Sequence, residues 1–461
     1  MKKLFCFLCF SLTYILAYAQ STYFNKRYDF YNSWEVSWNI IQKDSSYYLS
    51  GGAGQSQSNF SKIGCIKINS NGDTVFKKIY GTDSIYFSTG LSGAMIETVD
   101  SCFIMAGSTS NINSDYNSML FKINTVGDSL WCKIYDTPAH SEIAYQIKQL
   151  PGRDFIICGV TDTLGNDQGL LMRTDSLGNI IWKKTYGNGS DEMFCSVDIM
   201  QDGSFIASGY RTNGINYVTY VVKTDASGNS QWQQFFSNDG GCIVACSFIE
   251  YSIGWKDYTK LYLIKLSSSG ALQWQQKYGA ARWGTFPWIV YQLPDSNFII
   301  TGNITDTSAT RIFGLVAHIK YNGDSIFNRN YQKLTGQNSE NYLRDIKQTP
   351  DGGFVACGFV APLAPDTGTQ DMWVIKLDSM GCDTANCQTN TGIFNHTPQT
   401  VEVTVYPNPA TNSITISTSI YLQNTELIIY DLTGKEIYRK QEDILPKKQK
   451  LIPLHFRKAF T

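Results

Sequence analysis

Short alternations of apolar and polar residues recur along most of the chain, and each alternation is bounded by Gly, Asn, Asp or Ser. A period of two predicts half-buried β-strands, and the helical period of about 3.6 residues is not seen in these stretches. The stretches align on a glycine, here called the repeat Gly, that follows a Lys or Arg by five residues in most units. The seven repeat glycines are Gly72, Gly127, Gly178, Gly228, Gly270, Gly323 and Gly381.

Further markers divide each unit into four strands, which we name A to D in chain order. In the first six units an aromatic residue stands four positions after the repeat Gly, and another stands four positions further on, as in "WKKTY" at 182–186. A second glycine, the strand B Gly, ends an aromatic-led run such as "FIICG" at 155–159. Turns such as "QDGS" often precede that run, which indicates hairpins. Four antiparallel strands in every ~40–50 residues are typical of a β-propeller blade.

The chain begins with a strand D that has no unit of its own. In "FNKRY" at 24–28, Phe24 and Tyr28 occupy the two aromatic positions, whereas the seventh unit stops at Gly381 and has Ala385 in place of the aromatic residue. The first and last units of a closed ring must meet, and an unpaired strand edge there is a liability. We therefore expect an all-β, seven-bladed β-propeller whose N-terminal strand closes the last blade.

The fifth unit is irregular. Its segment "SNDGGCIVACSF" runs from strand D almost directly into strand B, so that about one strand is missing. This blade is expected either to have three strands or to merge strands A and B.

Charge and composition support an all-β protein and exclude some partners. Lys plus Arg total 38 and Asp plus Glu total 39, so no net field attracts nucleic acid or an anionic membrane. The chain is 14% aromatic and contains 38 Gly, which suits pleated strands and turns. No cofactor or metal is expected, because no suitable set of ligands is seen.

Residues 1–19 have the pattern of a secretory signal peptide. Lys2 and Lys3 precede an apolar run, and "AYA" at 17–19 places the cleavage between Ala19 and Gln20. The run is shorter than the ~20 residues of a membrane-spanning helix, and no later stretch is apolar enough to span a bilayer. We expect export through the periplasm, a propeller over 20–385, a linker over 386–400 and a C-terminal domain over 401–461.

Most of the twelve cysteines lie singly in apolar strand patterns, where Cys behaves as a small buried hydrophobe. Cys382 and Cys387 stand close together in a polar segment and are expected to form a disulfide. A zinc site there would need two further ligands, and no CxxC or paired His motif supplies them.

The segment "TDSLGNIIW" at 174–182 resembles the Asp-x-x-Gly-x-x-x-Trp element of pyrroloquinoline-quinone-type propellers, and it is a near match to the sialidase Asp-box. The first family also uses a cofactor pocket with a calcium ion and often a pair of adjacent cysteines. No two cysteines are adjacent in this sequence. The competing interpretation is that the Asp shapes the turn between strands C and D and the Trp packs between blades.

The C-terminal domain resembles the type A C-terminal sorting domain of type IX secretion substrates. The motif residues are Tyr406, Pro407, Asn408 and Pro409 in "VTVYPNPATNSITI", and Gly434 in "YDLTGK" at 430–435. The resemblance implies a small Ig-like β-sandwich, recognition by the type IX machinery, and secretion or attachment at the outer-membrane surface. The segment "KKQKLIPLHFRKAFT" lacks the last hairpin of the family, so an incomplete domain is expected.

Three hypotheses remain for the function of the propeller: a secreted or surface binding module, a secreted enzyme, and a spacer. A hydrolase, lyase or quinoprotein-like oxidoreductase would need convergent catalytic groups, and none stands at informative spacing. The fold alone does not decide, because propellers host both roles. We therefore expect a binding module without catalytic residues.

The rim that carries the D–A and B–C loops is the expected binding face. Arg282 and Trp283 in "GAARWGTFPW" at 279–288, together with Arg211 in a B–C loop, are candidate contacts for a glycan, another surface polymer or a protein. The competing interpretation is that Trp283 and Trp288 fill the gap left by the shortened fifth blade.

Overall fold

The computed structural model consists of two compact units, Met1–Gln388 and Thr389–Thr461. It describes residues 23–30, 33–55, 58–110, 116–137, 140–163, 165–187, 190–212, 217–232, 243–253, 256–266, 272–305, 311–336, 339–362, 368–384, 387, 403–406, 414–418, 422–430, 436–445 and 448–451. Outside these residues lie the predicted signal peptide, its cleavage position at Ala19 and Gln20, and most of the predicted linker.

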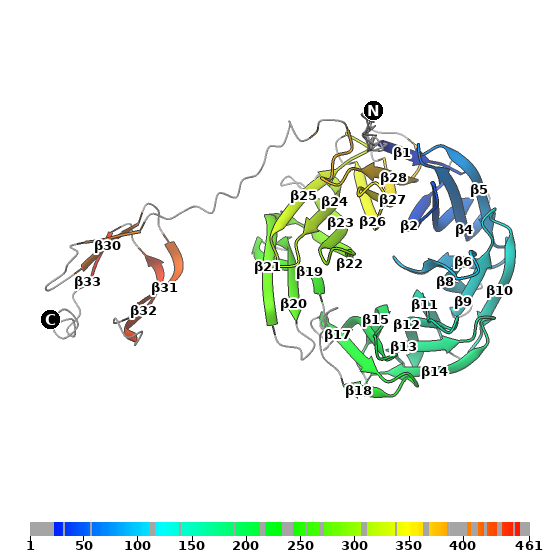
Figure 1. Ribbon diagram of the computed structural model, residues 1–461, viewed down its shortest axis with the longest axis horizontal. Helices are drawn as coiled ribbons and strands as arrows, with labels where there is room; N and C mark the ends of the chain where they lie inside the picture. Colours follow the sequence, from blue (N-terminus) through cyan, green and yellow to red (C-terminus); the bar gives the residue numbers. More distant parts are fainter. Residues whose placement is uncertain are drawn as a thin grey trace, which may run out of the picture. The chain divides into compact units, whose positions relative to one another are not determined.

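The first unit is a β-propeller of seven blades, counted over the described residues. Figure 1 shows the blades standing around a ring, with strand A inside and strand D outside. Blade one contains β2 (Glu35–Lys43), β3 (Ser46–Gln55), β4 (Ser58–Asn69) and β5 (Thr74–Tyr80). Blade two contains β6 (Tyr86–Thr89), β7 (Met95–Glu97), β8 (Phe103–Ser110), β9 (Asn117–Ile123) and β10 (Ser129–Tyr135). Blade three contains β11 (Glu142–Gln149), β12 (Phe155–Thr163), β13 (Asn166–Thr174) and β14 (Ile180–Tyr186).

The remaining blades follow the same order. Blade four contains β15 (Glu192–Ile199), β16 (Phe205–Thr212), β17 (Tyr217–Thr224) and β18 (Ser230–Trp232). Blade five contains β19 (Ile243–Ile253), β20 (Lys256–Leu266) and β21 (Leu272–Trp283). Blade six contains β22 (Thr285–Gln292), β23 (Phe298–Thr305), β24 (Ile312–Ile319) and β25 (Ser325–Tyr331). Blade seven contains β26 (Glu340–Gln348), β27 (Phe354–Ala361), β28 (Asp371–Leu377) and β1 (Phe24–Tyr28).

The N-terminal strand closes the ring, as the sequence predicts. Strand β1 pairs antiparallel with β28, from Phe24 opposite Lys376 to Tyr28 opposite Met372. The Trp373 indole Nε1 donates a hydrogen bond of 2.7 Å to the Asn25 side-chain oxygen. The seventh blade therefore takes its three inner strands from one end of the propeller sequence and its outer strand from the other end.

The two aromatic positions of the repeat hold neighbouring blades together. The Tyr28 hydroxyl donates to the carbonyl oxygen of Gly72 in blade one, at 2.7 Å. Gly72 has φ of 75°, and a Cβ there would lie 2.8 Å from the Phe24 ring, so the position requires glycine for both reasons. We call this contact the Tyr–Gly clamp, and it recurs at Tyr80–Gly127, Tyr135–Gly178, Tyr186–Gly228, Tyr278–Gly323 and Tyr331–Gly381.

The Lys or Arg that precedes the repeat Gly pairs with an acidic residue of the A–B turn. In blade seven, the Lys376 ammonium is buried and lies 2.8 Å from the Asp351 carboxylate. The same pairing occurs at Lys122–Asp100, Arg173–Asp154 and Lys223–Asp202.

The Asp-box-like residues shape the C–D turn. The Asp175 carboxylate accepts hydrogen bonds from the backbone N–H groups of Leu177 and Asn179, at 2.9 and 2.8 Å. The Trp182 ring lies against Gly228 of the next blade, within 2.8 Å of where a Cβ would be. The structural interpretation of this motif is thus confirmed.

Two blades depart from the regular pattern. Blade five has three strands in the described residues, where residues 233–242 are not included. In blade two, strand A is divided into β6 and β7, and both parts pair with β8. The sequence predicted the first irregularity but not the second.

The second unit, described by its backbone alone, contains two small sheets. One consists of β29 (Val403–Tyr406), β30 (Ile414–Thr418) and β33 (Lys448–Leu451), and the other of β31 (Leu422–Tyr430) and β32 (Glu436–Leu445). Tyr406 ends β29, whereas Pro407, Asn408, Pro409 and Gly434 lie outside the described residues. The Ig-like arrangement of this unit and its incompleteness remain predictions.

Candidate functional site

The inner strands of the propeller carry β-bulges at equivalent positions. In blades one, three, four, six and seven, the register between strands A and B shifts by one residue. A bulge leaves one residue without an opposite partner and redirects its side chain. The five bulge residues are Trp38, Tyr145, Cys195, Trp288 and Arg344.

The strand B Gly is required by these bulges. A Cβ on Gly159 would lie 1.9 Å from the carbonyl oxygen of Ile143, a distance that no side chain tolerates. The equivalent distances at the other four bulged blades lie between 1.8 and 2.2 Å, at Gly51, Gly209, Gly302 and Gly358. The strand B Gly of the sequence therefore indicates that the backbone of strand A lies too close to strand B for any side chain at that position.

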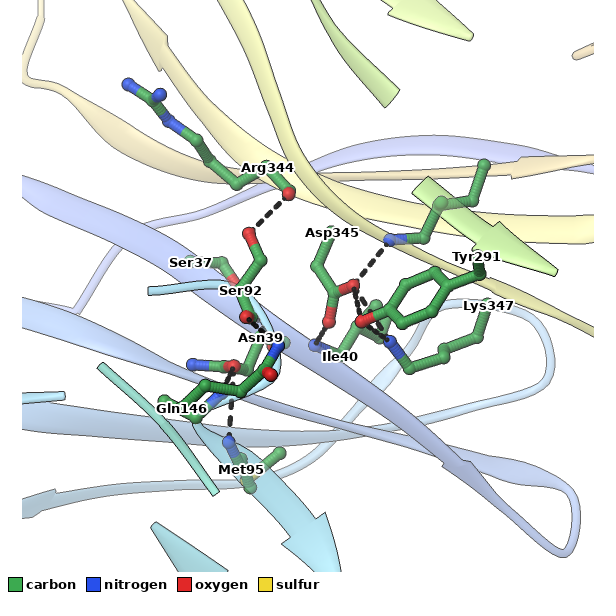
Figure 2. Close-up of polar contacts among 12 residues, drawn as sticks. Ser37, Asn39, Ile40, Ser92, Met95, Gln146, Tyr291, Arg344, Asp345 and Lys347 are labelled. Atoms are coloured by element: carbon green, nitrogen blue, oxygen red, sulfur yellow. Dashed lines mark hydrogen bonds and ion pairs between the residues drawn. The ribbon is translucent and has the colours of Figure 1, made fainter. Parts of the chain in front are cut away.

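A ring of polar contacts fixes the residues beside the bulges (Figure 2). The Asp345 carboxylate of blade seven accepts a hydrogen bond of 3.0 Å from the backbone N–H of Ile40 in blade one. The Asn39 side-chain oxygen of blade one accepts one of 3.2 Å from the backbone N–H of Met95 in blade two. The Gln146 side-chain oxygen of blade three accepts one of 2.8 Å from the backbone N–H of Val197 in blade four.

Blade two has a short loop, residues 90–94, where the other blades have a bulge. The Ser92 hydroxyl in this loop donates a hydrogen bond of 2.6 Å to the carbonyl oxygen of Arg344 (Figure 2). The Gln146 amide nitrogen donates to the carbonyl oxygen of Ser92, at 3.2 Å. The loop thus links blade two to blade seven on one side and to blade three on the other.

A pocket of about 330 Å³ lies beside this loop. Its lining includes four aromatic side chains, from Trp38, Tyr86, Tyr116 and Tyr145. It also includes the hydroxyl groups of Ser61, Ser88, Thr89, Ser108 and Ser110, with Gly90, Leu91 and Ile143 completing it. Tyr86 begins strand A, Ser110 ends strand B and Tyr116 precedes strand C of blade two, so the pocket opens on the rim of the D–A and B–C loops.

The electrostatics of the pocket are those of neutral side chains. Burial raises the pKa of the Tyr145 hydroxyl well above its usual value, so this group is a hydrogen-bond donor at neutral pH. A second, more open hollow of about 480 Å³ borders the A–B turn of blade two on the other rim, at Ile96, Val99 and Gln149. The pocket beside the loop is the better candidate because it is more enclosed and four aromatic residues line it.

Arg344 lies inside a group of aromatic rings. Its guanidinium carbon is 3.7 Å from the centroid of a Trp288 ring and 4.7 Å from that of Trp38. Tyr342 and Phe359 lie at 5.1 and 5.3 Å. Trp38 and Trp288 also contact each other edge to face, with centroids 6.4 Å apart. We call these five residues the Arg344 box.

The Arg344 side chain is buried without enough hydrogen-bond acceptors. The residue is 7% exposed, and its Nε and Nη1 atoms have no hydrogen-bond partner among the described residues. Burial lowers the pKa of the guanidinium to about 10, although the nearby Tyr342 opposes this. Each buried unpaired donor costs about 1–3 kcal/mol, and each cation–π contact returns about 0.5–2 kcal/mol. The rings therefore stabilise the cation but do not supply hydrogen-bond acceptors for its Nε and Nη1 atoms.

Of the predicted contact residues, Arg211 has a described side chain, and it is not among the residues that line the pocket. The Arg211 Nε atom of β16 lies 3.5 Å from the carboxylate of Glu192, which is 1% exposed, so Arg211 balances a buried charge within blade four. Arg282 and Trp283 end β21, where they stand opposite Thr259 and Tyr258 of β20, and their side chains are outside the described residues.

Trp288 projects from the bulge of β22 and is 41% exposed. Its indole Nε1 donates a hydrogen bond of 2.6 Å to the Asn303 side chain. Its ring contacts are with Arg344 of blade seven and Trp38 of blade one. These contacts place Trp288 in the Arg344 box, on the side of blade six that faces blade seven.

Cys382 and Cys387 form a disulfide at the end of blade seven. Cys382 occupies the position after the repeat Gly, where Asp or Asn stands in most units. The Arg329 guanidinium of blade six lies 2.7 Å from the Cys387 sulfur. The bond thus forms part of the contact between blades six and seven.

The described residues contain one group of three acidic side chains that could hold a metal ion. Asp29, Glu35 and Asp371 offer oxygen atoms within 4.8 Å of one another. The Arg27 Nε atom already donates a hydrogen bond of 2.7 Å to Asp371. We interpret this group as part of the ring closure between β1 and β28.

The comparisons with known proteins concern each unit separately. Residues 404–455 match the family model described as "Secretion system C-terminal sorting domain", so this segment is a type IX sorting domain and the chain is a substrate for that export route. No curated protein matches the chain. The described residues include no helix that is long and apolar enough to cross a membrane.

Several solved structures are similar to this chain at low identity. The β-propeller domain of the Trilobed protease from Pyrococcus furiosus has a TM-score of 0.40 and 9% identity, over 74% of this chain and 93% of that one. The α-L-arabinofuranosidase Arb93A from Fusarium graminearum has a TM-score of 0.42 and 10% identity, over 77% and 98%. A prolyl endopeptidase has a TM-score of 0.40 and 8% identity, and this chain spans 55% of its length.

Proposed function

We propose that this exported β-propeller is a binding protein that binds a saccharide. The proposed site is the pocket of about 330 Å³ beside the loop of blade two, here called the Trp38 pocket. The observation that carries the proposal is the lining of the pocket, in which four aromatic rings stand among serine hydroxyl groups. Aromatic faces pack against the C–H faces of sugar rings, while hydroxyl groups exchange hydrogen bonds with sugar hydroxyls. Both kinds of side chain are held on strands or at strand ends, which keeps the pocket preformed.

The lining favours binding over catalysis. The twelve described residues that line the pocket include no carboxylate, imidazole or thiol side chain. A glycoside hydrolase usually needs two carboxyl groups that flank the scissile bond. We therefore place the enzyme hypotheses below the binding hypothesis.

The sorting domain sets where binding takes place. Recognition by the type IX machinery delivers the propeller to the surrounding medium or to the cell surface. We propose that the segment 1–19 first directs the chain to the periplasm. A saccharide at the cell surface or in the medium would then be within reach of the propeller rim.

The test is saccharide binding by the purified exported chain. A glycan array selects ligands, and calorimetry measures their affinity for wild type, Trp38→Ala and Tyr116→Ala. Tyr116 is 46% exposed, so its removal should leave the fold intact. We expect each variant to bind about tenfold more weakly, because about 1.4 kcal/mol corresponds to one stacked ring.

Trp34→Ala is the matched control, because Trp34 is also 46% exposed and does not line the pocket. Its affinity should equal that of wild type. Binding that survives both pocket substitutions, or no binding by wild type to any saccharide, would reject the proposed function.

A further inference from the structure

We propose that the ligand is an acidic saccharide and that Arg344 binds its carboxylate. This inference rests on the proposed function, because it adds a charged group to the sugar that the Trp38 pocket takes. Arg344 lies close to the pocket, is surrounded by aromatic rings and has no acidic partner among the described residues.

Arg344 is one side chain away from the pocket. Trp38 lines the pocket and its ring also contacts the Arg344 guanidinium at 4.7 Å. Leu91 lines the pocket as well, and the next residue, Ser92, holds the carbonyl oxygen of Arg344. A ligand with two or more linked sugar rings would therefore reach from the pocket to the Arg344 box.

The acidic side chain next to Arg344 is already engaged elsewhere. Asp345 accepts hydrogen bonds from the backbone N–H of Ile40 and from the Tyr291 hydroxyl, at 3.0 Å each. It also pairs with the Lys347 ammonium at 2.8 Å, as Figure 2 shows. A carboxylate that meets three such donors is not available to a second cation.

The guanidinium is oriented but not satisfied. The Trp288 and Trp38 rings contact it, with centroids 3.7 and 4.7 Å from its central carbon, and its Nε and Nη1 atoms have no hydrogen-bond partner among the described residues. Guanidinium N–H groups form a planar fork that matches a carboxylate. Trp288 is 41% exposed, so the ring nearest to the cation also borders solvent. This arrangement is that of a preformed carboxylate-binding group.

A purely structural arginine would give a different result on substitution. Methionine has a similar length and no charge, so Arg344→Met would remove an uncompensated buried cation and keep most of the packing. If Arg344 serves the ligand, this variant should keep or raise its melting temperature and lose affinity for acidic saccharides. If Arg344 serves the fold, the melting temperature should fall.

The experiment compares each uronic-acid oligosaccharide with its own methyl ester. Calorimetry would use oligogalacturonate, oligoalginate and hyaluronan oligosaccharides, in the acid and the esterified form, on wild type, Arg344→Met and Arg344→Lys. We expect wild type to bind at least one acid about 10- to 100-fold more tightly than its ester, the value of a charge-assisted hydrogen bond. Arg344→Met should bind the acid and the ester equally, and Arg344→Lys should recover part of the preference.

The outcomes separate the two proposals. Equal binding of acid and ester by wild type, or a preference that persists in Arg344→Met, would overturn the role of Arg344 while leaving a saccharide site in the pocket. No binding of any saccharide by wild type would overturn the proposed function and this inference together. If Arg344→Met does not fold, Arg344→Lys decides the question, because a preference for the acid as large as that of wild type would overturn the role of Arg344.

Discussion

Removing the aromatic residues of β1 tests whether the N-terminal strand carries the ring closure. Phe24 is 6% exposed and packs against Gly72 and against Tyr47, whose ring centroid is 6.0 Å away. Replacing a buried Phe by Ala typically costs about 3–5 kcal/mol. Tyr28→Phe keeps the ring and removes the hydroxyl that donates to Gly72, which should cost about 1–2 kcal/mol.

These energies convert to measurable shifts in melting temperature. Unfolding entropy is about 2.1 cal/mol/K per residue, so a unit spanning Met1–Gln388 shifts by about 1.2 °C for each kcal/mol. We expect Phe24→Ala to lower the melting temperature by about 4–6 °C and Tyr28→Phe by about 1–2 °C. Deletion of residues 20–31 removes the ladder with β28 as well, so it should cost more than either substitution.

Matched variants within the repeat supply the controls. Tyr80→Phe removes the equivalent clamp between blades one and two, where the hydroxyl donates to Gly127 at 2.6 Å. Tyr80→Phe should lower the free energy of unfolding as much as Tyr28→Phe if the closure through β1 is equivalent to any other contact between blades. Val75→Ala, at a position 55% exposed, should have almost no effect. Calorimetry that finds Phe24→Ala and the deletion as stable as wild type would refute the closure.

Three further predictions concern other parts of the chain. Gly159→Ala should lower the melting temperature strongly or prevent folding, because its Cβ would meet the Ile143 carbonyl oxygen at 1.9 Å, whereas Gly152→Ala, with open space around it, should be tolerated. Cys387→Ser should lower the free energy of unfolding by about 2 kcal/mol, the value expected for a short closed loop. Mass mapping of the exported protein without reductant should find Cys387 linked to Cys382, and free thiols would contradict the disulfide. Removing residues 401–461 should leave the melting temperature of the propeller unchanged and retain the protein inside the cell, so continued export without this segment would count against its sorting role.

The sequence could predict the fold because the blade contacts are encoded in each repeat. Phe24 and Tyr28 were recognisable as a strand D because Tyr80 and Tyr186 stand in the same pattern. The structure shows that the pattern follows from one contact, the Tyr–Gly clamp, which the described residues repeat six times around the ring. A local contact that is repeated leaves a periodic signal, and a periodic signal can be read without alignment.

The candidate site leaves no such signal. Trp38, Trp288 and Arg344 come from three different blades, and ring closure brings them together across about 300 positions of sequence. The strand B Gly does report a close approach of backbone, so a bulge in strand A could have been inferred from it. Which bulge residues meet depends on the loop of blade two, which the repeat pattern does not contain. The sequence suggested Arg211 as a ligand contact, but in the structure it pairs with the buried Glu192. A single acidic residue at the start of a strand does not reveal such a pairing in the sequence.

The shared blade also orders the folding of the chain in time. The Trp373 indole contacts Asn25 across a separation of 348 residues, so β1 has no partner until nearly the whole propeller has been synthesised. Blades one to six can form from neighbouring segments, whereas the seventh waits for a contact of very high sequence separation, the slow kind. The entropy of closing so long a loop grows only with the logarithm of its length, so the delay is kinetic and costs little final stability. The last strand of the propeller, β28, is followed within the chain by the sorting segment 404–455. During synthesis, the strands that complete the ring are therefore made shortly before the C-terminal sorting segment 404–455.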